Sequence, residues 1–104
     1  MSQVKHAVLI RFRSDATAAQ VDAAMADLAG LKDRIPGLLS FSGGTNMSPE
    51  GLHKGFTHGF VMTFADVAAR DRYLPHPEHE ATKARVLPLI DGGIDGVLVF
   101  DWVE

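Results

Sequence analysis

The chain has 104 residues, 46% of them apolar, with 10 basic against 13 acidic side chains and a formal net charge of −3. This length suits one domain, residues 1–104, that buries its own core, and the scattered basic residues provide no positive stripe for a nucleic-acid backbone. The absence of cysteine excludes disulfides, thiolate catalysis and sulfur-ligated metals.

The first continuous apolar run covers only residues 7–10. It is too short for a signal segment and far from the ~20 residues that span a bilayer. We therefore expect a cytoplasmic protein that has neither a membrane nor a nucleic acid as a partner.

The first half of the chain predicts a strand, a helix and a second strand. Residues 3–13 alternate, with His6 and Val8 on one face and Leu9 on the other. An amphipathic helix with a candidate N-cap at Thr17 follows and ends at residues 35–37, which include a proline and a glycine. Residues 38–45 predict the second strand, and a polar loop with glycine and proline follows.

The second half repeats this order. Residues 56–64 alternate strongly and predict a third strand whose apolar face includes Phe56 and Phe60. Asp66 is expected to cap a helix over residues 67–73, which two prolines separate from a second helical piece over residues 77–89. The alternation of residues 97–103 predicts a fourth strand.

The order βαββαβ is typical of a ferredoxin-like α+β fold, a four-stranded antiparallel sheet with two helices on one face. We expect the spatial strand order 4-1-3-2, and within it we expect the neighbouring first and third strands to run parallel. The other face would expose Ala7, Leu9, Val61 and alternate residues of the fourth strand. Such an apolar patch predicts a homodimer through the open sheet face.

Several segments together resemble the stress-responsive dimeric α/β-barrel family. The most specific is residues 73–79, in which His76 and His79 flank a proline and a glutamate. The others are residues 4–6, residues 34–38, residues 46–52, Phe64 and residues 100–101. The resemblance covers essentially the whole chain and implies a dimeric α/β-barrel, in which two such sheets pack face to face.

Two histidines are candidates for a binding cleft. His6 and His58 lie near the starts of the first and third strands, on the face that the helices cover, so we expect their rings to be close together. A largely apolar cleft with a few polar groups is typical of a small-molecule site, and burial would keep the imidazoles neutral. The alternative is that both rings complete the core and bond backbone carbonyls.

The resemblance adds roles for other residues. In plant cyclases of the family, histidine and tyrosine at the positions of His79 and Tyr73 act as the catalytic base and its hydrogen-bonding partner. Where those cyclases carry another pocket tyrosine, this chain has Leu28. The expected catalytic residues are therefore His79 and Tyr73, and the expected ligand-binding residues are His6, Val8, Leu28, His58 and Phe60.

His76 and His79 also have the i, i+3 spacing of neighbours on a helix. Zinc sites usually use an i, i+4 pair with a third ligand nearby, which this sequence does not offer. We expect no metal and no cofactor, and we expect His76 to cap the helix that begins at Pro77. The role of His53 stays open.

Four functions remain open at this point. The first is the binding of a small, partly apolar ligand in a histidine-lined cleft. The second is an enzyme that closes a ring in a poly-β-keto substrate, with His79 as the base. A purely structural, stress-resistant oligomer is the third. The fourth, a haem-degrading monooxygenase of the related dimeric barrel group, would need an axial histidine and a wide pocket.

Overall fold

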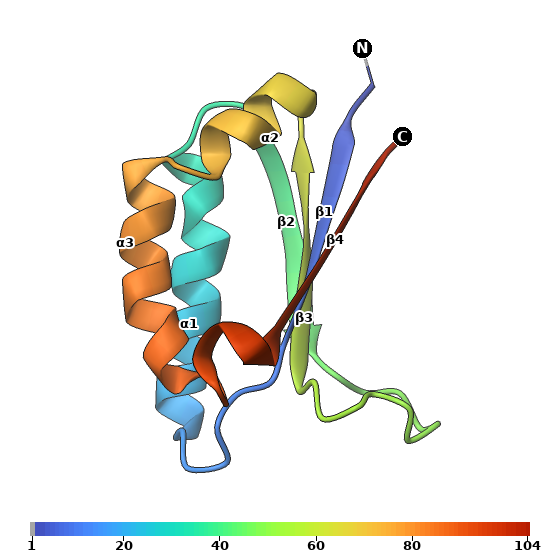
Figure 1. The fold of residues 1–104 in the computed structure, drawn as a ribbon, viewed down its shortest axis with the longest axis vertical. Helices are drawn as coiled ribbons and strands as arrows, with labels where there is room; N and C mark the ends of the chain where they lie inside the picture. The colour runs from blue at the N-terminus through green and yellow to red at the C-terminus, as the bar shows by residue number, and fades with distance from the viewer. Residues whose placement is uncertain (1) are drawn as a thin grey trace.

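The computed structural model describes residues 2–104 as one four-stranded sheet with helices packed on a single face (Figure 1). The elements are β1 (Val4–Ile10), α1 (Ala18–Gly30), η1 (Leu31–Asp33), β2 (Leu38–Thr45), β3 (His58–Phe64), α2 (Val67–Tyr73), α3 (Pro77–Val86), η2 (Leu87–Leu89), η3 (Gly93–Gly96) and β4 (Val97–Val103). The strand order is β2-β3-β1-β4. This is the predicted ferredoxin-like fold.

The predicted parallel direction of the first and third strands is wrong. β1 pairs with β3 in the antiparallel sense, so that His6 lies opposite Met62, and Ile10 lies opposite His58. The crossover through α1 makes β1 parallel to β2, but β3 returns antiparallel to β2 and is inserted between them. His6 and His58 therefore lie at opposite ends of the strand pair.

The predicted caps are present and α2 has the predicted bounds, whereas α1 and α3 are shorter than expected. Thr17 forms a capping box: its hydroxyl accepts from Gln20 N at 3.1 Å, and Thr17 N donates to Gln20 Oε1 at 2.9 Å. The Asp66 carboxylate accepts from Ala69 N at 2.8 Å and starts α2. Both long helices end in a turn of 3-10 helix, η1 after α1 and η2 after α3.

Two strands are also shorter than the alternation predicted. β1 ends at Ile10, and Phe12 continues the pairing only through an isolated bridge to Ile90. β3 begins at His58, so Phe56 lies in the preceding loop rather than on the apolar face of the strand. The backbone before it turns through positive φ angles at Lys54 (56°) and Gly55 (83°), which a continuous strand does not contain.

The core lies between the sheet and the helices. Its fully buried residues include Val4, Ile10, Leu31, Met62 and Phe64. The opposite face is open, and β4 contributes Leu98, Phe100 and Trp102 to it, because these residues pair in register with Leu9, Ala7 and Lys5. Within residues 2–104, no helix combines the length and apolar character needed to cross a membrane.

Candidate functional site

A cavity of about 280 Å³ lies between α3 and the part of the sheet formed by β1 and β4. Most of its wall is apolar and includes Val8, Leu28, Phe60, Val86, Ile90 and Val97. Four polar side chains also line it: His6, Tyr73, His79 and Lys83. An apolar cavity with a few polar groups is typical of a site for a small molecule.

His79 reaches the cavity from the first turn of α3. His76 caps this helix through its Nδ1, which accepts from Glu78 N at 3.1 Å, and Pro77 occupies the first helical position, as predicted. His79 Nδ1 lies 2.9 Å from the carbonyl oxygen of Leu74. A carbonyl only accepts, so Nδ1 carries the proton and Nε2 of the neutral ring is left with a free lone pair.

The electrostatic surroundings keep His79 neutral. Burial lowers the pKa of its imidazole below the usual 6.5, and the nearby positive charge of Lys83 acts in the same direction. The hydrogen bond to Leu74 and the carboxylate of Glu80 oppose this shift without cancelling it. At neutral pH the ring is therefore unprotonated at Nε2, which is the form that a general base requires.

Tyr73 stacks on His79 rather than bonding to it. The two ring centroids are 4.1 Å apart and the planes differ by 26°, while the histidine hydrogen bond goes to Leu74. The tyrosine hydroxyl makes no hydrogen bond within residues 2–104. Every fully buried polar side-chain atom in that range has a hydrogen-bond partner, so the unpaired hydroxyl of Tyr73 is not fully buried. It opens onto the cavity that Tyr73 lines. Burial raises the pKa of Tyr73, so its hydroxyl stays protonated and is a hydrogen-bond donor.

His6 is held by the carboxylate of Asp101, a residue that the sequence links to the family but not to the cleft. Its Nδ1 donates to Asp101 Oδ1 at 2.7 Å, and Asp101 Oδ2 accepts from Arg70 at 2.6 Å. The His6 ring meets Tyr73 edge-on, with centroids 5.8 Å apart. The pairing of His6 with Asp101 depends on the register of β1 against β4, and no local pattern reveals that register.

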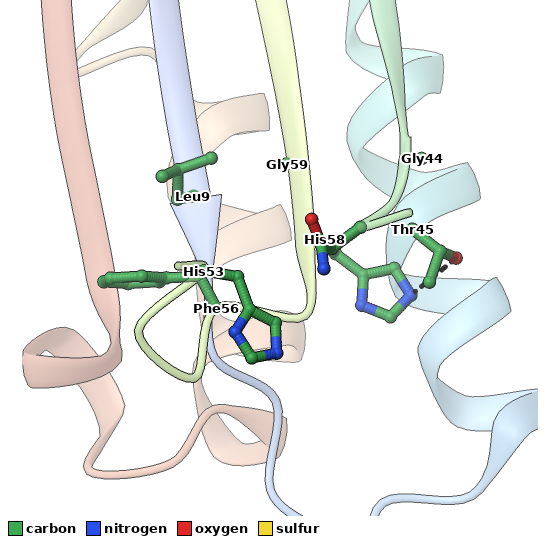
Figure 2. A pocket seen from close by; sticks show the side chains of 8 residues that line it. Leu9, Gly44, Thr45, His53, Phe56, His58 and Gly59 are labelled. Atoms are coloured by element: carbon green, nitrogen blue, oxygen red, sulfur yellow. Dashed lines mark hydrogen bonds between the residues drawn. The ribbon is translucent and has the colours of Figure 1, made fainter. Parts of the chain in front are cut away.

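The prediction that His58 joins this cavity is wrong, because the antiparallel register places it at the other end of the strand pair. His58 lines a separate hollow of about 330 Å³ with His53 and Phe56 (Figure 2). Both of its ring nitrogens face hydroxyls, Nδ1 at 2.9 Å from Thr57 and Nε2 at 3.3 Å from Thr45. Burial lowers the pKa of His58, and its ring packs edge-on against Phe12.

The cavity therefore collects most of the residues singled out from the sequence. It brings together His6, Val8, Leu28, Phe60, Tyr73 and His79, and it leaves out His58. His76 lies outside it and serves as a helix cap. Within residues 2–104, no group of three or more histidine, aspartate or glutamate side chains is placed to hold a metal ion.

Fold and cavity together define a ferredoxin-like domain with a histidine-bearing pocket between sheet and helices. Residues 4–104 match the family model of the stress responsive A/B barrel domain, and the chain belongs to this family. The stress-response A/B barrel domain-containing protein HS1 of Arabidopsis thaliana is 31% identical over 95% of this chain and 87% of its own length. Olivetolic acid cyclase of Cannabis sativa is 28% identical over 73% of this chain and 75% of its own length.

Solved structures agree with the fold. A dimeric ferredoxin-like protein of unknown function from Jannaschia sp. CCS1 is 33% identical, covers 96% of this chain and 97% of its own, and superposes with a TM-score of 0.84. The hydroxynitrile lyase of Passiflora edulis is 25% identical, covers 98% of this chain and 93% of its own, and has a TM-score of 0.87. The ferredoxin-like architecture is thus shared with structures described as dimeric.

Proposed function

We propose that the cavity binds a small, mostly apolar molecule through one polar head and that His79 removes a proton from it. The observation that carries the proposal is the fixed tautomer of His79, which leaves Nε2 free on a ring that stacks on Tyr73, whose hydroxyl stays protonated. A base and a hydrogen-bond donor at one end of an apolar cavity suit a ligand with a carbonyl group. The donor would stabilise negative charge on the oxygen while the base takes the neighbouring proton.

The distribution of polar groups limits the ligand. His6, Tyr73 and His79 lie near one another, and the ammonium group of Lys83 is paired with Glu80 at 2.8 Å. In the wall of the cavity, the side chains of Leu28 and Phe60 offer no hydrogen bond. Each further carbonyl buried against that wall would lose its bonds to water, at a cost of about 1–3 kcal/mol. The cavity therefore favours a ligand with a single polar end over an extended poly-β-keto chain.

Two relatives support chemistry of this kind. One is named as a hydroxynitrile lyase and the other as olivetolic acid cyclase. When a base takes the hydroxyl proton of a hydroxynitrile, the carbonyl forms as the carbon–carbon bond to the nitrile breaks and cyanide leaves. Ring closure at a carbonyl also begins with proton removal. Ring closure of a poly-β-keto substrate stays as the second candidate. Leu28 has no hydroxyl that could orient such a substrate, which is evidence against this second candidate.

The test is a proton-exchange assay. The wild-type protein is incubated in deuterated buffer with a panel of small apolar ketones and aldehydes and of linear poly-β-keto thioesters, and NMR follows ligand binding and the loss of α-protons. We expect at least one ketone or aldehyde to bind and to exchange about a hundredfold faster than in buffer. A His53→Ala variant, altered in the other hollow, should behave like the wild type.

Two outcomes would contradict the proposal. If no panel member binds, the proposed ligand binding is contradicted and the result favours a purely structural function. If ligands bind without faster exchange, His79 is not a base. Cyclisation of the linear thioesters in preference to reaction of the simple ketones would favour the second candidate.

We expect Tyr73→Phe to slow exchange about tenfold while changing the free energy of unfolding by less than about 1 kcal/mol. The ring still stacks on His79, and only an unpaired hydroxyl is lost, so the core stays packed. The rate falls because the developing negative charge loses one donor. Exchange kinetics measure the rate, and thermal melts measure the change in stability. An unchanged rate would show that the tyrosine hydroxyl takes no part in the reaction.

A further inference from the structure

One side chain with a fixed charge lines the cavity, and it has no part in the proton transfer proposed above. Among the described residues of the lining, Lys83 is the only lysine or arginine, and no aspartate or glutamate is present. The Lys83 side chain is 39% exposed, so it lies at the mouth of the cavity rather than in its depth. A charged residue in a mostly apolar site fixes the orientation of a ligand that carries the opposite charge.

The ammonium group of Lys83 lies at the same end of the cavity as the proposed base. Lys83 follows His79 by four residues, so both side chains project from one face of α3. The Lys83 stem leans back towards the start of the helix, because its Nζ lies 2.8 Å from Oε1 of Glu80. After burial, the positive charge of Lys83 is the next cause that lowers the pKa of His79. Since Tyr73 stacks on His79, the tyrosine, the imidazole and the ammonium group form one polar end.

An anionic ligand can take the place of the present partner of Lys83. The Glu80 side chain is 52% exposed, and exposed ion pairs of this kind contribute little stability. On the sheet side, the carboxylate of Asp101 is already compensated, because it accepts from Arg70 at 2.6 Å and from His6 at 2.7 Å. A negative group at the polar end therefore gains Lys83 as a partner and does not face a free carboxylate of Asp101.

We propose that the cavity takes a 2-oxo acid with an apolar side chain, an inference that rests on the proposed function of His79 as a base. The carboxylate of the ligand binds the ammonium group of Lys83, and the adjacent carbonyl accepts from the hydroxyl of Tyr73. The apolar side chain extends along the wall that includes Val8 and Leu28. A carboxylate further along the ligand would instead lie against this apolar wall without a partner, which is costly.

The bound charge of Lys83 also assists the reaction. Nε2 of His79 takes a proton from the methylene next to the carbonyl, and the electron pair of the broken C–H bond forms the carbon–carbon double bond of an enolate. The enolate oxygen gains a negative charge, which Tyr73 stabilises. The carboxylate would oppose this second negative charge, and its pairing with Lys83 reduces that repulsion. Return of a solvent deuteron from His79 to the same carbon restores the oxo acid, so no other reactant is needed.

The test compares two probes that differ only in the carboxylate. They are 4-methyl-2-oxopentanoate and 4-methylpentan-2-one, in which a methyl group replaces the carboxylate. NMR titration in deuterated buffer gives a dissociation constant and an exchange rate at the shared methylene for each probe. We expect the wild type to bind the oxo acid about tenfold more tightly than the ketone, because a hydrogen bond between charged groups is stronger than a neutral one. High salt should narrow this preference, since the ammonium group is partly exposed.

Variants of the ion pair on α3 assign the preference to Lys83. Lys83→Met keeps the apolar stem and removes the charge, so it should bring the two affinities to within about twofold of each other, whereas Lys83→Arg should keep most of the preference. Glu80→Gln removes the competing carboxylate and should tighten binding of the oxo acid about threefold. The matched control is Lys32→Met in η1, outside the cavity, which should leave both dissociation constants unchanged. Each comparison is made within one variant, so it does not depend on small changes in stability.

The imidazole of His79 provides a second measurement. A carboxylate bound at Lys83 adds negative charge near the ring and offsets the positive charge that lowers its pKa. The pKa of His79 should therefore be higher in the complex with the oxo acid than in the complex with the ketone. NMR titration of the imidazole in the two complexes measures the difference, and equal values would contradict the placement of the carboxylate.

The outcomes separate this inference from the proposed function. If the wild type binds both probes equally, or if Lys83→Met keeps the preference, the assignment of a 2-oxo acid is overturned, while exchange of the ketone still supports His79 as a base. If the oxo acid is preferred but neither probe exchanges faster than in buffer, the ligand class is supported and the base is contradicted. Binding of neither probe overturns both.

Discussion

Replacing His79 with alanine is expected to lower the rate of proton exchange about a hundredfold or more while the protein stays folded. The substitution removes a cavity-lining imidazole whose Nδ1 bond to Leu74 leaves Nε2 as an acceptor, and positioned general bases contribute about 10²–10⁴-fold. The ring is half-buried at the start of α3, so its loss should cost only about 1 kcal/mol of stability. His79→Gln should be as slow, because an amide has no basic nitrogen.

The matched control is His76→Ala in the same turn. It removes the N-cap of α3 and should lower the free energy of unfolding by about 1 kcal/mol, yet it lies outside the cavity and should leave the exchange rate unchanged. Exchange assays and thermal melts on both variants separate the two roles. If His79→Ala only lowers the melting temperature, His79 has a structural role and is not the base.

The pH dependence follows from the lowered pKa of His79. Its folded-state pKa lies below 6.5, so Nε2 stays unprotonated at pH 7 and the rate should fall only as the pH drops through that lower value. NMR titration of the imidazole measures the pKa directly. A value above 6.5, or a rate that falls already between pH 8 and pH 7, would contradict the assigned base.

Replacing Asp27 with alanine is expected to lower the free energy of unfolding by about 2–3 kcal/mol. Asp27 on α1 accepts hydrogen bonds from Arg34 at 3.1 Å, from Thr82 at 3.1 Å and from Arg85 at 2.6 Å. It thereby joins α1 to α3, the two helices that supply Leu28 and Val86 to the cavity wall. Thr82 is fully buried, so its hydroxyl would lose a partner in a place where an unpaired polar group is costly.

The same carboxylate predicts acid sensitivity. The hydrogen bond from Arg85 lowers the pKa of Asp27 from 3.8 to about 2. A folded-state pKa below the unfolded one stabilises the protein above about pH 3.8, and this stability is lost as the pH falls towards 2. The shift corresponds to about 2 kcal/mol at most, because Arg85 is more than half exposed and partly screened.

Denaturant unfolding at several pH values tests this expectation. Asp27→Asn should be less stable than the wild type at pH 7 and should lose the acid-dependent part of the unfolding free energy between pH 4 and pH 2. Asp15→Asn is the control, since the Arg13–Asp15 pair is exposed and lies away from the helix contact. Equal effects of the two substitutions on the free energy of unfolding would show that the contact of Asp27 with α3 stabilises the protein no more than an exposed ion pair does.

Local patterns determined the elements and the faces of this protein. Alternation placed His6 and Val8 towards the helices and Leu9 on the open side, because successive side chains of a strand point to opposite faces. Capping chemistry located the starts of the helices at Thr17, Asp66 and His76, since a side-chain acceptor there satisfies a free backbone N–H. The motif that contains Tyr73 and His79 identified the family, and the family model then confirmed it.

The tertiary structure decided which of these residues meet. The prediction that His58 joins the cavity rests on its face and on an expected parallel direction of the first and third strands, but the antiparallel insertion of β3 places it at the far end of the sheet. The bond from His6 to Asp101 and the tautomer fixed by Leu74 each depend on the position of one atom of another segment. Alternation and capping arise within a few neighbouring residues, whereas strand direction and register are set by contacts between residues far apart in the chain. The sequence by itself therefore determined the elements, their faces and the family, and only the folded chain brought Tyr73 and His79 together in one cavity.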